Sequence, residues 1–306
     1  MGILSNYMNN SIVKGSLLVA LGASSYGMLT TFVKMAYAEG FTSYEIIFSQ
    51  MILGMIGLVL INLLFVKGKS TSQFEPKSKS ILKLMAAGTS LGLTSTFYYF
   101  AIKYIPVSIG IVLLMQSVWM GVFLEGIINK KKPSLNKIIA VIVILAGTVL
   151  ATNMLFSSIE LDWRGIGWGM MAAISYTITI YTSNTVSLQL HSLRRSLWML
   201  LGGTLVVTII ATPFLIEQFN LEIFKKWGLI LALFGTILPP ILFTAGMPKI
   251  NVGLGAIISS VELPVAVILA YILLNEVVNP YQWLGIGVIL AAVVVMNLPK
   301  RKKNPK

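Results

Sequence analysis

The sequence predicts an all-α integral membrane protein with ten transmembrane helices, arranged as two inverted five-helix repeats. Three observations lead to this fold class. Of the 306 residues, 56% are hydrophobic and only 11% are charged, whereas a soluble domain carries about 25% charged residues. The apolar residues gather in long runs, and similar motifs open the two halves of the chain. A disordered chain is excluded, because disorder requires low hydrophobicity.

A membrane-spanning helix needs about 20 apolar residues. Ten runs of roughly this length are present, and short connections join them. The runs cover residues 14–33, 44–66, 81–103, 107–127, 135–154, 165–187, 195–216, 227–247, 252–274 and 281–298. They are too long and too uniformly apolar for the alternating strands of an outer-membrane barrel. Because no connection is long enough for a soluble domain, we expect a single membrane domain.

The net charge of +13 arises from 23 Lys and Arg against 10 Asp and Glu. In a soluble protein this excess would suggest a nucleic-acid partner. When the connections are assigned alternately to two sides, however, most basic residues fall on the side of the two termini. These are Lys14, Lys67, Lys69, Lys77, Lys79, Lys83, Lys130, Lys131, Lys132, Lys137, Arg194, Arg195, Lys249, Lys300, Arg301, Lys302, Lys303 and Lys306. The positive-inside rule therefore predicts a multi-pass protein of the cell (inner) membrane with both termini cytoplasmic, and no nucleic-acid partner.

The two halves share motifs in the same order. KGSLLVALGASSY at 14–26 is similar to RGIGWGMMAAISY at 164–176, and IPVSIGI at 105–111 is similar to INVGLGA at 250–256. Each half then holds five runs. Because five is odd, the second half enters the membrane the opposite way round. The result is an inverted repeat with a pseudo-two-fold axis in the membrane plane, an arrangement found in many secondary transporters.

The chain resembles the drug/metabolite transporter superfamily, specifically its EamA-type branch with two five-helix modules. The Gly-x₇-Ala-x-Ser-Tyr pattern that opens each half carries this resemblance, together with the stretch 252–295, which has a Pro-bearing ninth run and a Gly-rich last run. The resemblance covers essentially the whole chain and implies the modules 1–156 and 157–306, the second with a basic cytoplasmic tail. It specifies the family well and the substrate poorly.

The first half departs from the family pattern at two positions. Lys131, inside NKKKP, stands where a turn glutamate aligned with Glu276 is expected. Trp119 stands where the second half has Pro264. We therefore expect the two halves to differ in function.

Glu262 is the sharpest functional candidate. It lies near the middle of the ninth run, where an acidic side chain costs about 2.5–3.5 kcal/mol on insertion scales. Such a side chain must face a cavity or a partner, or carry a proton. We interpret Glu262 as a contact for a substrate amine or as a proton-coupling site. The alternative is a structural hydrogen bond that locks this helix to a neighbour.

Three prolines are predicted hinges. Pro264 follows Glu262 by two residues and would free the carbonyl of Ser260 toward the same cavity, because proline has no N–H. Pro239 and Pro240 interrupt the eighth run. Membrane helices also tolerate proline without a functional role, which is the alternative.

Polar and aromatic side chains of other runs are further candidates. Gln116 and Trp119 are three residues apart and share a helix face, which fits either a polar and stacking pocket wall or interhelical packing. Tyr26 and Tyr176 are related by the repeat. Other candidates for the cavity are Ser175 and one of the neighbouring Tyr98 and Tyr99, of which we choose Tyr99. The alternative for these tyrosines is packing or anchoring at the membrane interface. For Glu125, near Lys130–Lys132, a solvated position at the interface is the favoured interpretation.

The scarcity of histidine, aspartate and cysteine in the sequence excludes several enzyme classes. The single histidine, His191, lies in a connection, so zinc chemistry of the HExxH type is unavailable. The single aspartate, Asp162, excludes an intramembrane aspartate pair, and there is no cysteine. Gly68-Lys69-Ser70 mimics the end of a phosphate-binding loop, but Leu63 replaces the glycine that such a loop requires. We therefore expect neither an enzyme nor a bound cofactor or metal.

These observations predict a secondary active transporter of a small metabolite in the lipid bilayer. The resemblance favours export of an amino acid or related compound by alternating access, with protons or an exchanged solute as the coupled species. We expect the substrate site near the midplane, between the first, third, fourth, sixth, eighth and ninth runs. The alternative is a non-transporting polytopic membrane scaffold or a lipid-handling protein.

Overall fold

The computed structural model describes residues 2–66, 78–154, 162–217 and 219–297. Within these ranges the chain is helical and contains no strand. The helices are α1 (Gly2–Ala38), α2 (Ser43–Phe65), α3 (Ser78–Ala101), α4 (Val107–Leu114), α5 (Ser117–Ile128), α6 (Leu135–Ala151), α7 (Trp163–Thr185), α8 (Ser192–Glu217), α9 (Leu229–Ala232), α10 (Leu238–Gly246), α11 (Val252–Ser259), α12 (Glu262–Leu273) and α13 (Pro280–Asn297). The π-helical turn η2 (Phe224–Gly228) precedes α9, the π-helical turn η3 (Leu233–Ile237) connects α9 to α10, and the 3-10 turn η4 (Met247–Lys249) follows α10. Together they form one continuous helical segment, Phe224–Lys249. The all-α prediction is confirmed.

Seven helical segments of the described ranges are long and apolar enough to cross a membrane. They are Asn10–Ala38, Ser43–Phe65, Val107–Ile128, Ser192–Ile216, Phe224–Lys249, Val252–Leu273 and Pro280–Asn297. Helix α6 is apolar but shorter. Helices α3 and α7 contain many serine, threonine and glycine residues, and they pack against each other inside the bundle. The polytopic membrane fold is therefore confirmed, whereas ten spans in inverted repeats remain a prediction.

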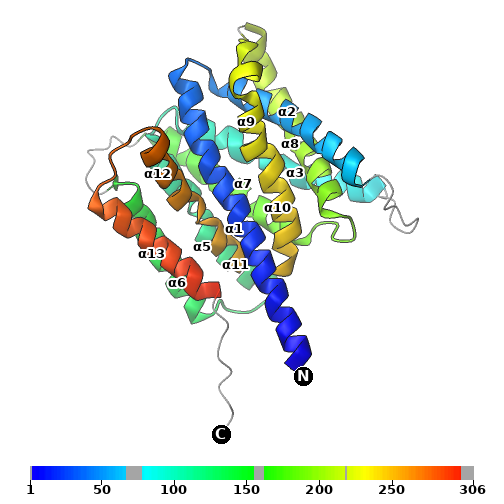
Figure 1. The fold of residues 1–306 in the computed structure, drawn as a ribbon, viewed down its shortest axis with the longest axis vertical. Helices are drawn as coiled ribbons and strands as arrows, with labels where there is room; N and C mark the ends of the chain where they lie inside the picture. Colours follow the sequence, from blue (N-terminus) through cyan, green and yellow to red (C-terminus); the bar gives the residue numbers. More distant parts are fainter. Residues whose placement is uncertain (1, 67–77, 155–161, 218, 298–306) are drawn as a thin grey trace.

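Helix α1 runs diagonally through the centre of the bundle (Figure 1). It packs against α10 and α12, whereas α3 packs against α7 and α8. On one edge α6 pairs with α13, and on the other α2 pairs with α8. The start of α1 and the end of α13 lie at the same end of the molecule (Figure 1). We call this the termini end, and the opposite one the far end.

Glycines allow the helix backbones to approach closely. A Cβ atom at Gly88 of α3 would collide with the backbone carbonyl of Met199 on α8, and one at Gly202 would collide with that of Met85. In a bilayer the lipid tails are as apolar as leucine, so small residues at helix interfaces provide packing that hydrophobicity cannot. The α3–α8 contact therefore depends on these two glycines.

Two membrane-spanning segments break near their middle. Segment Val107–Ile128 changes from α4 to α5 at Met115 and Gln116, and segment Val252–Leu273 changes from α11 to α12 at Ser260 and Val261. The carbonyl of Ser260 accepts a hydrogen bond from the Leu263 N–H at 3.3 Å. The prediction that this carbonyl is free was therefore wrong, because the chain closes a tight turn that satisfies it. The first break occurs without any proline, so Pro264 alone does not explain the second.

Pro239 and Pro240 lie in the first turn of α10, directly after the π-helical turn η3. Neither proline has a backbone N–H, so the carbonyls one turn earlier lose their helical donors. One of these carbonyls belongs to Gly235, which borders the central cavity. π-Turns interrupt helices most often at functional sites.

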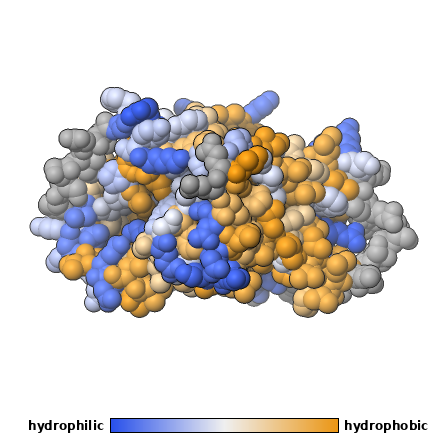
Figure 2. All heavy atoms as spheres, turned by 90° about the horizontal axis from the view of Figure 1, so that it is seen from above, coloured by the Kyte–Doolittle hydropathy of each residue, from blue (hydrophilic) through white to orange (hydrophobic). Residues whose placement is uncertain are grey.

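The outer surface is largely apolar. Exposed large apolar side chains occur on the helices throughout the bundle, for example Leu64, Ile209 and Leu229. Viewed from above, apolar atoms cover much of the visible surface, and hydrophilic residues gather in patches between them (Figure 2). Such a surface would be an aggregation liability in water and suits contact with lipid.

Candidate functional site

A cavity lies in the middle of the bundle. Side chains of α1, α3, α4, α7 and α12 line it, together with one residue each of α2 and η3. The space open to the centre of a water-sized molecule is ≈ 90 Å³. The cavity therefore draws on the first, third, fourth, sixth, eighth and ninth apolar runs, and also on Gln50 of the second.

Glu262 brings a carboxyl group to this cavity. It is the first residue of α12, at the helix break, and it is only partly buried. Tyr176 Oη on α7 donates a hydrogen bond to Glu262 Oε2 at 3.3 Å. The break places the carboxyl group at the start of a helix, where a negative charge is favoured by the helix dipole. Glu262 thus faces a cavity and a partner, the two environments that an intramembrane acid requires.

Aromatic rings close the cavity toward the termini end. Tyr26 and Tyr176 meet edge to face with ring centroids 6.2 Å apart. Phe243 on α10 contacts Tyr26 in the same way at 5.8 Å and is buried. Edge-to-face packing is a preferred geometry for aromatic rings. The three rings thus separate Glu262 from the termini end of the bundle.

Two buried polar atoms beside the cavity lack hydrogen-bond partners within the described residues. They are Gln50 Oε1 and Tyr98 Oη. Gln50 is only 1% exposed, and a Cβ atom at Gly235 would lie 3.1 Å from its Oε1. A buried polar group without a partner costs about 1–3 kcal/mol. Their place at the cavity wall suits them to hydrogen-bond a polar ligand.

The structure brings four predicted site residues to the cavity: Tyr26, Tyr99, Tyr176 and Glu262. Ser175 does not line it. Its hydroxyl donates to the backbone carbonyl of Ser90 on α3 at 2.8 Å. Adjacent helix residues point about 100° apart, so Ser175 faces α3 while Tyr176 faces the cavity.

Gln116 and Trp119 also lie away from this cavity. Trp119 Nε1 donates to Gln116 Oε1 at 3.0 Å, and Gln116 Nε2 donates to the Val112 carbonyl one turn earlier. The shared helix face is as expected. However, Trp119 is 38% exposed on the outside of the bundle, so the pair satisfies its own polar atoms at the surface and does not form a wall of the cavity.

A second cavity adjoins the first toward the far end. The two share Thr30, Ile111, Leu263 and Ala266 as lining residues. An ion pair borders this second cavity, with Lys34 Nζ 3.0 Å from Glu276 Oε1. It joins the last turns of α1 to the connection after α12. The route from Glu262 to the far end therefore passes a charged pair at the surface.

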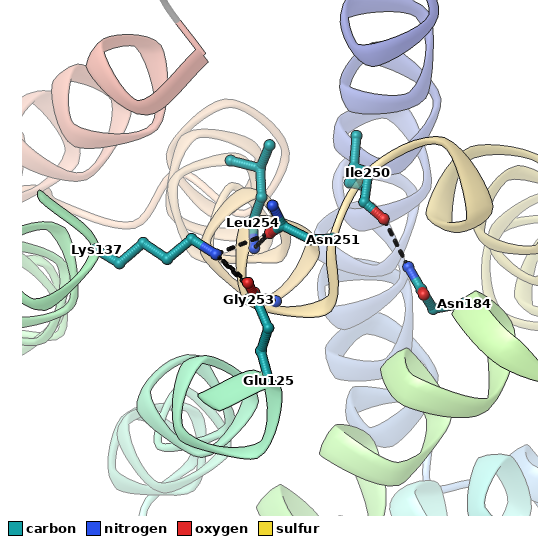
Figure 3. Close-up of polar contacts among 7 residues, drawn as sticks. All are labelled: Glu125, Lys137, Asn184, Ile250, Asn251, Gly253 and Leu254. Atoms are coloured by element: carbon teal, nitrogen blue, oxygen red, sulfur yellow. Dashed lines mark hydrogen bonds and ion pairs between the residues drawn. The ribbon is translucent and has the colours of Figure 1, made fainter. Parts of the chain in front are cut away.

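A polar network joins the helices at the termini end. Glu125 of α5 contacts Lys137 Nζ of α6 at 2.6 Å and accepts a hydrogen bond from the Gly253 N–H at 2.7 Å. Lys137 also donates to Asn251 Oδ1 at 3.0 Å. Figure 3 shows both side chains pointing toward the start of α11. The side chain of Glu125 is only 16% exposed, so its interpretation as a solvated acid was wrong.

Two further polar links hold this end together. Asn184 at the end of α7 donates to the Ile250 carbonyl at 2.8 Å (Figure 3). Arg195, expected in a connection, is only 2% exposed and donates to the carbonyls of Ser183, Val186 and Thr244. A cation near a helix C-terminus is favoured by the helix dipole. Arg195 thus joins the ends of α7 and α10.

Sequence reasoning missed Gln50 as a cavity residue and named Tyr98 only as the alternative to Tyr99, whereas both tyrosines line the cavity. The available signal was weak, because a single glutamine inside an apolar run also fits interhelical packing. The described residues contain no group of three His, Cys, Asp or Glu side chains that could hold a metal ion.

The sequence matches the family model of the EamA-like transporter family over residues 13–153 and again over 163–298. The chain belongs to the EamA-like transporter family. Members of this family are transporters and not enzymes, which makes the protein a membrane transporter of small solutes. The two matched ranges correspond to the two halves that share sequence motifs.

A crystal structure of another protein has the same fold as this EamA-like chain. The TM-score is 0.74 at 12% identity, and the alignment covers 92% of this chain and 98% of the other. At this identity the likeness shows the fold alone. A search of curated protein sequences gives no match.

Proposed function

We propose that the protein is a secondary active transporter of a small amine-bearing metabolite, an amino acid or a related compound, and that it works by alternating access. The observation that carries this proposal is the central cavity with Glu262 at its wall. Aromatic rings beside a carboxylate form a site for an organic cation, because both attract positive charge. Gln50 and Tyr98 provide hydrogen-bonding atoms for the rest of the solute.

The proposal includes ten spans in two inverted modules, 1–156 and 157–306. Helix contacts support this symmetry. A Cβ atom at Gly15 would meet Ile250, and one at Gly165 would meet Ile105. Gly15 aligns with Gly165, and Ile105 aligns with Ile250 by their shared motifs. The two halves thus pack against each other through equivalent pairs, as a pseudo-two-fold axis requires.

Alternating access requires that each end can close separately. Lys34 and Glu276 pair at the far end, whereas Glu125, Lys137 and the aromatic rings close the termini end. In the described arrangement the second cavity lies on the far side of Glu262. With both termini in the cytoplasm of the cell (inner) membrane, that side faces outward. The family resemblance favours export.

The proposal gives Glu262 one of two roles: it contacts the substrate amine, or it carries a coupled proton. The two roles predict different dependences of the transport rate on pH. A counterflow assay in proteoliposomes tests the function itself. We expect saturable exchange of a labelled amine-bearing solute, and complete absence of exchange across a library of amino acids and amines would favour a scaffold or a lipid-handling protein instead.

A further inference from the structure

A basic turn connects α5 to α6 at the termini end and borders two adjoining cavities. Its sequence, Asn129 to Pro133, is NKKKP. One cavity of ≈ 380 Å³ lies beside Glu125, Asn129, Ser134 and Lys137. The other, of ≈ 290 Å³, lies beside Phe123 and Ile127. Lys131 and Lys132 line both cavities, so the two lysines stand at the boundary between a polar and an apolar pocket.

The polar pocket carries an excess of positive charge. Its one acid, Glu125, is already paired with Lys137 at 2.6 Å and bonded to the Gly253 N–H. Lys131 and Lys132 are exposed and have no ion-pair partner among the described residues. Their charges are therefore free to attract an anion.

The apolar pocket opens on the outer surface of the bundle. Phe123 and Ile127 are each 58% exposed, and they lie on the same face of α5, one turn apart. Exposed apolar side chains at this position fit a hydrocarbon chain. The turn thus offers a cationic site for a headgroup directly beside an apolar surface for an acyl chain.

The fold does not require lysines at this turn. The matching connection of the second half runs from Leu274 to Asn279 and has the same length as the whole connection from Asn129 to Ser134. The aligned residues Lys130 and Asn275 both adopt left-handed backbone, with φ of 50° and 52°. The second turn achieves this conformation with Glu276 in place of Lys131. Lysine at position 131 is therefore not needed for the backbone of the turn, so its charge is available for orienting the protein in the membrane and for binding.

The backbone of the basic turn is held in place. The Lys131 N–H donates to the Gly126 carbonyl at 3.0 Å. A Cβ atom at Gly126 would lie 3.1 Å from the Lys131 carbonyl oxygen and 3.3 Å from the Pro133 ring. The turn therefore folds back tightly onto the end of α5, which fixes where its lysines leave the backbone.

We propose that this turn binds an anionic phospholipid, with Lys131 and Lys132 at the phosphate and an acyl chain along Phe123 and Ile127. Basic pockets between membrane helices on the cytoplasmic side are suited to such headgroups. The bound lipid would lie next to the Glu125–Lys137 pair that contacts the start of α11. It therefore stabilises the closed termini end, independently of which solute is carried.

Native mass spectrometry of the purified full-length protein tests the proposal. Binding of phosphatidylglycerol is compared with that of zwitterionic phosphatidylcholine and of glycerol 3-phosphate, which has no acyl chain. The variants are Lys131→Gln/Lys132→Gln and, as a matched control, Lys225→Gln/Lys226→Gln. The control lysines lie at the far end and are paired with Glu222 and Glu39.

We expect the wild type to prefer phosphatidylglycerol, and the Lys131→Gln/Lys132→Gln variant to bind it about 25-fold more weakly, about fivefold for each lysine. The control variant should bind as the wild type does. Equal affinity of the wild type and the Lys131→Gln/Lys132→Gln variant would overturn the proposal. Displacement of the lipid by glycerol 3-phosphate at similar concentration would also overturn it, because the site would then bind soluble phosphates. Circular dichroism is used to check that both double variants, whose substituted lysines are at the surface, are folded.

Discussion

Tyr176 on α7 donates a hydrogen bond to Glu262 at the start of α12, across the cavity in the middle of the bundle. This contact joins the two features that the sequence marks most clearly, the tyrosine that ends the repeated motif and the acid deep in the ninth run. Tyr26, the counterpart of Tyr176 in the first half, packs edge to face against it. The two tyrosines of the repeated motif and Glu262 therefore all lie at the central cavity.

Gly88→Ala should destabilise the fold. The added Cβ would collide with the Met199 backbone carbonyl, and overpacking of this kind costs about 1–3 kcal/mol. We expect a lower melting temperature in detergent by scanning fluorimetry. The matched control is Gly167→Ala, since a Cβ atom there meets nothing within 4 Å. An equal response of the two variants would contradict the close α3–α8 contact.

Arg195→Met should lower stability strongly. The change leaves the carbonyls of Ser183, Val186 and Thr244 without their donor, and each unsatisfied buried group costs about 1–3 kcal/mol. We expect a much lower melting temperature and lower expression. The neighbouring Arg194→Met is the control, because its side chain takes no part in these bonds. Wild-type stability of Arg195→Met would show that the three bonds are not needed.

The Lys34–Glu276 pair should control access from the far end. Because the chain has no cysteine, Thr30→Cys gives a single label on the lining shared by both cavities. We expect Lys34→Glu to speed the labelling by a membrane-impermeant reagent, because it removes the ion pair. The double swap Lys34→Glu/Glu276→Lys should restore the slow rate. Labelling that is equally fast in the double swap would argue against a gate.

Asp162, the residue before the first turn of α7, should make the stability of the fold depend on pH. Its carboxylate accepts hydrogen bonds from the Arg164 side chain and N–H, which lower its pKa below the ordinary value. A lowered pKa in the folded state contributes stability above the unfolded pKa, and this is lost as pH falls through the folded value. Asp162→Asn should therefore be less stable than the wild type at pH 7, and the difference in stability should shrink as the pH falls. A stability difference independent of pH would contradict this pairing.

The all-helical membrane fold could be predicted because each helix that crosses a bilayer needs a long run of apolar residues. The basic residues gather in the connections on one side, as expected for such a protein. The position of Glu262 on a cavity wall followed from the cost of an intramembrane acid. The rotation of each helix could not be predicted. Ser175 and Tyr176 are neighbours in the sequence, yet one bonds α3 and the other lines the cavity.

Other features depend on contacts between distant segments, which no local pattern shows. Arg195 was counted among the connection charges because its run begins there, but the ends of α7 and α10 surround it. Glu125 likewise finds Lys137 and Gly253 only after folding. Gln50 reaches the cavity because Gly235, far along the chain, leaves room beside it.

The most direct test of the central claim is counterflow of a labelled amine-bearing solute in proteoliposomes between pH 6 and pH 8, with Glu262→Gln compared against the wild type. The matched control is Glu222→Gln, an exposed acid at the far end. If Glu262 contacts the substrate, Glu262→Gln loses a charge-assisted hydrogen bond, and we expect its counterflow rate to be at least about tenfold lower than that of the wild type. If Glu262 carries the coupled proton, we expect the rate of Glu262→Gln to be independent of pH. A folded Glu262→Gln variant that keeps both the wild-type rate and the wild-type pH profile would contradict the account.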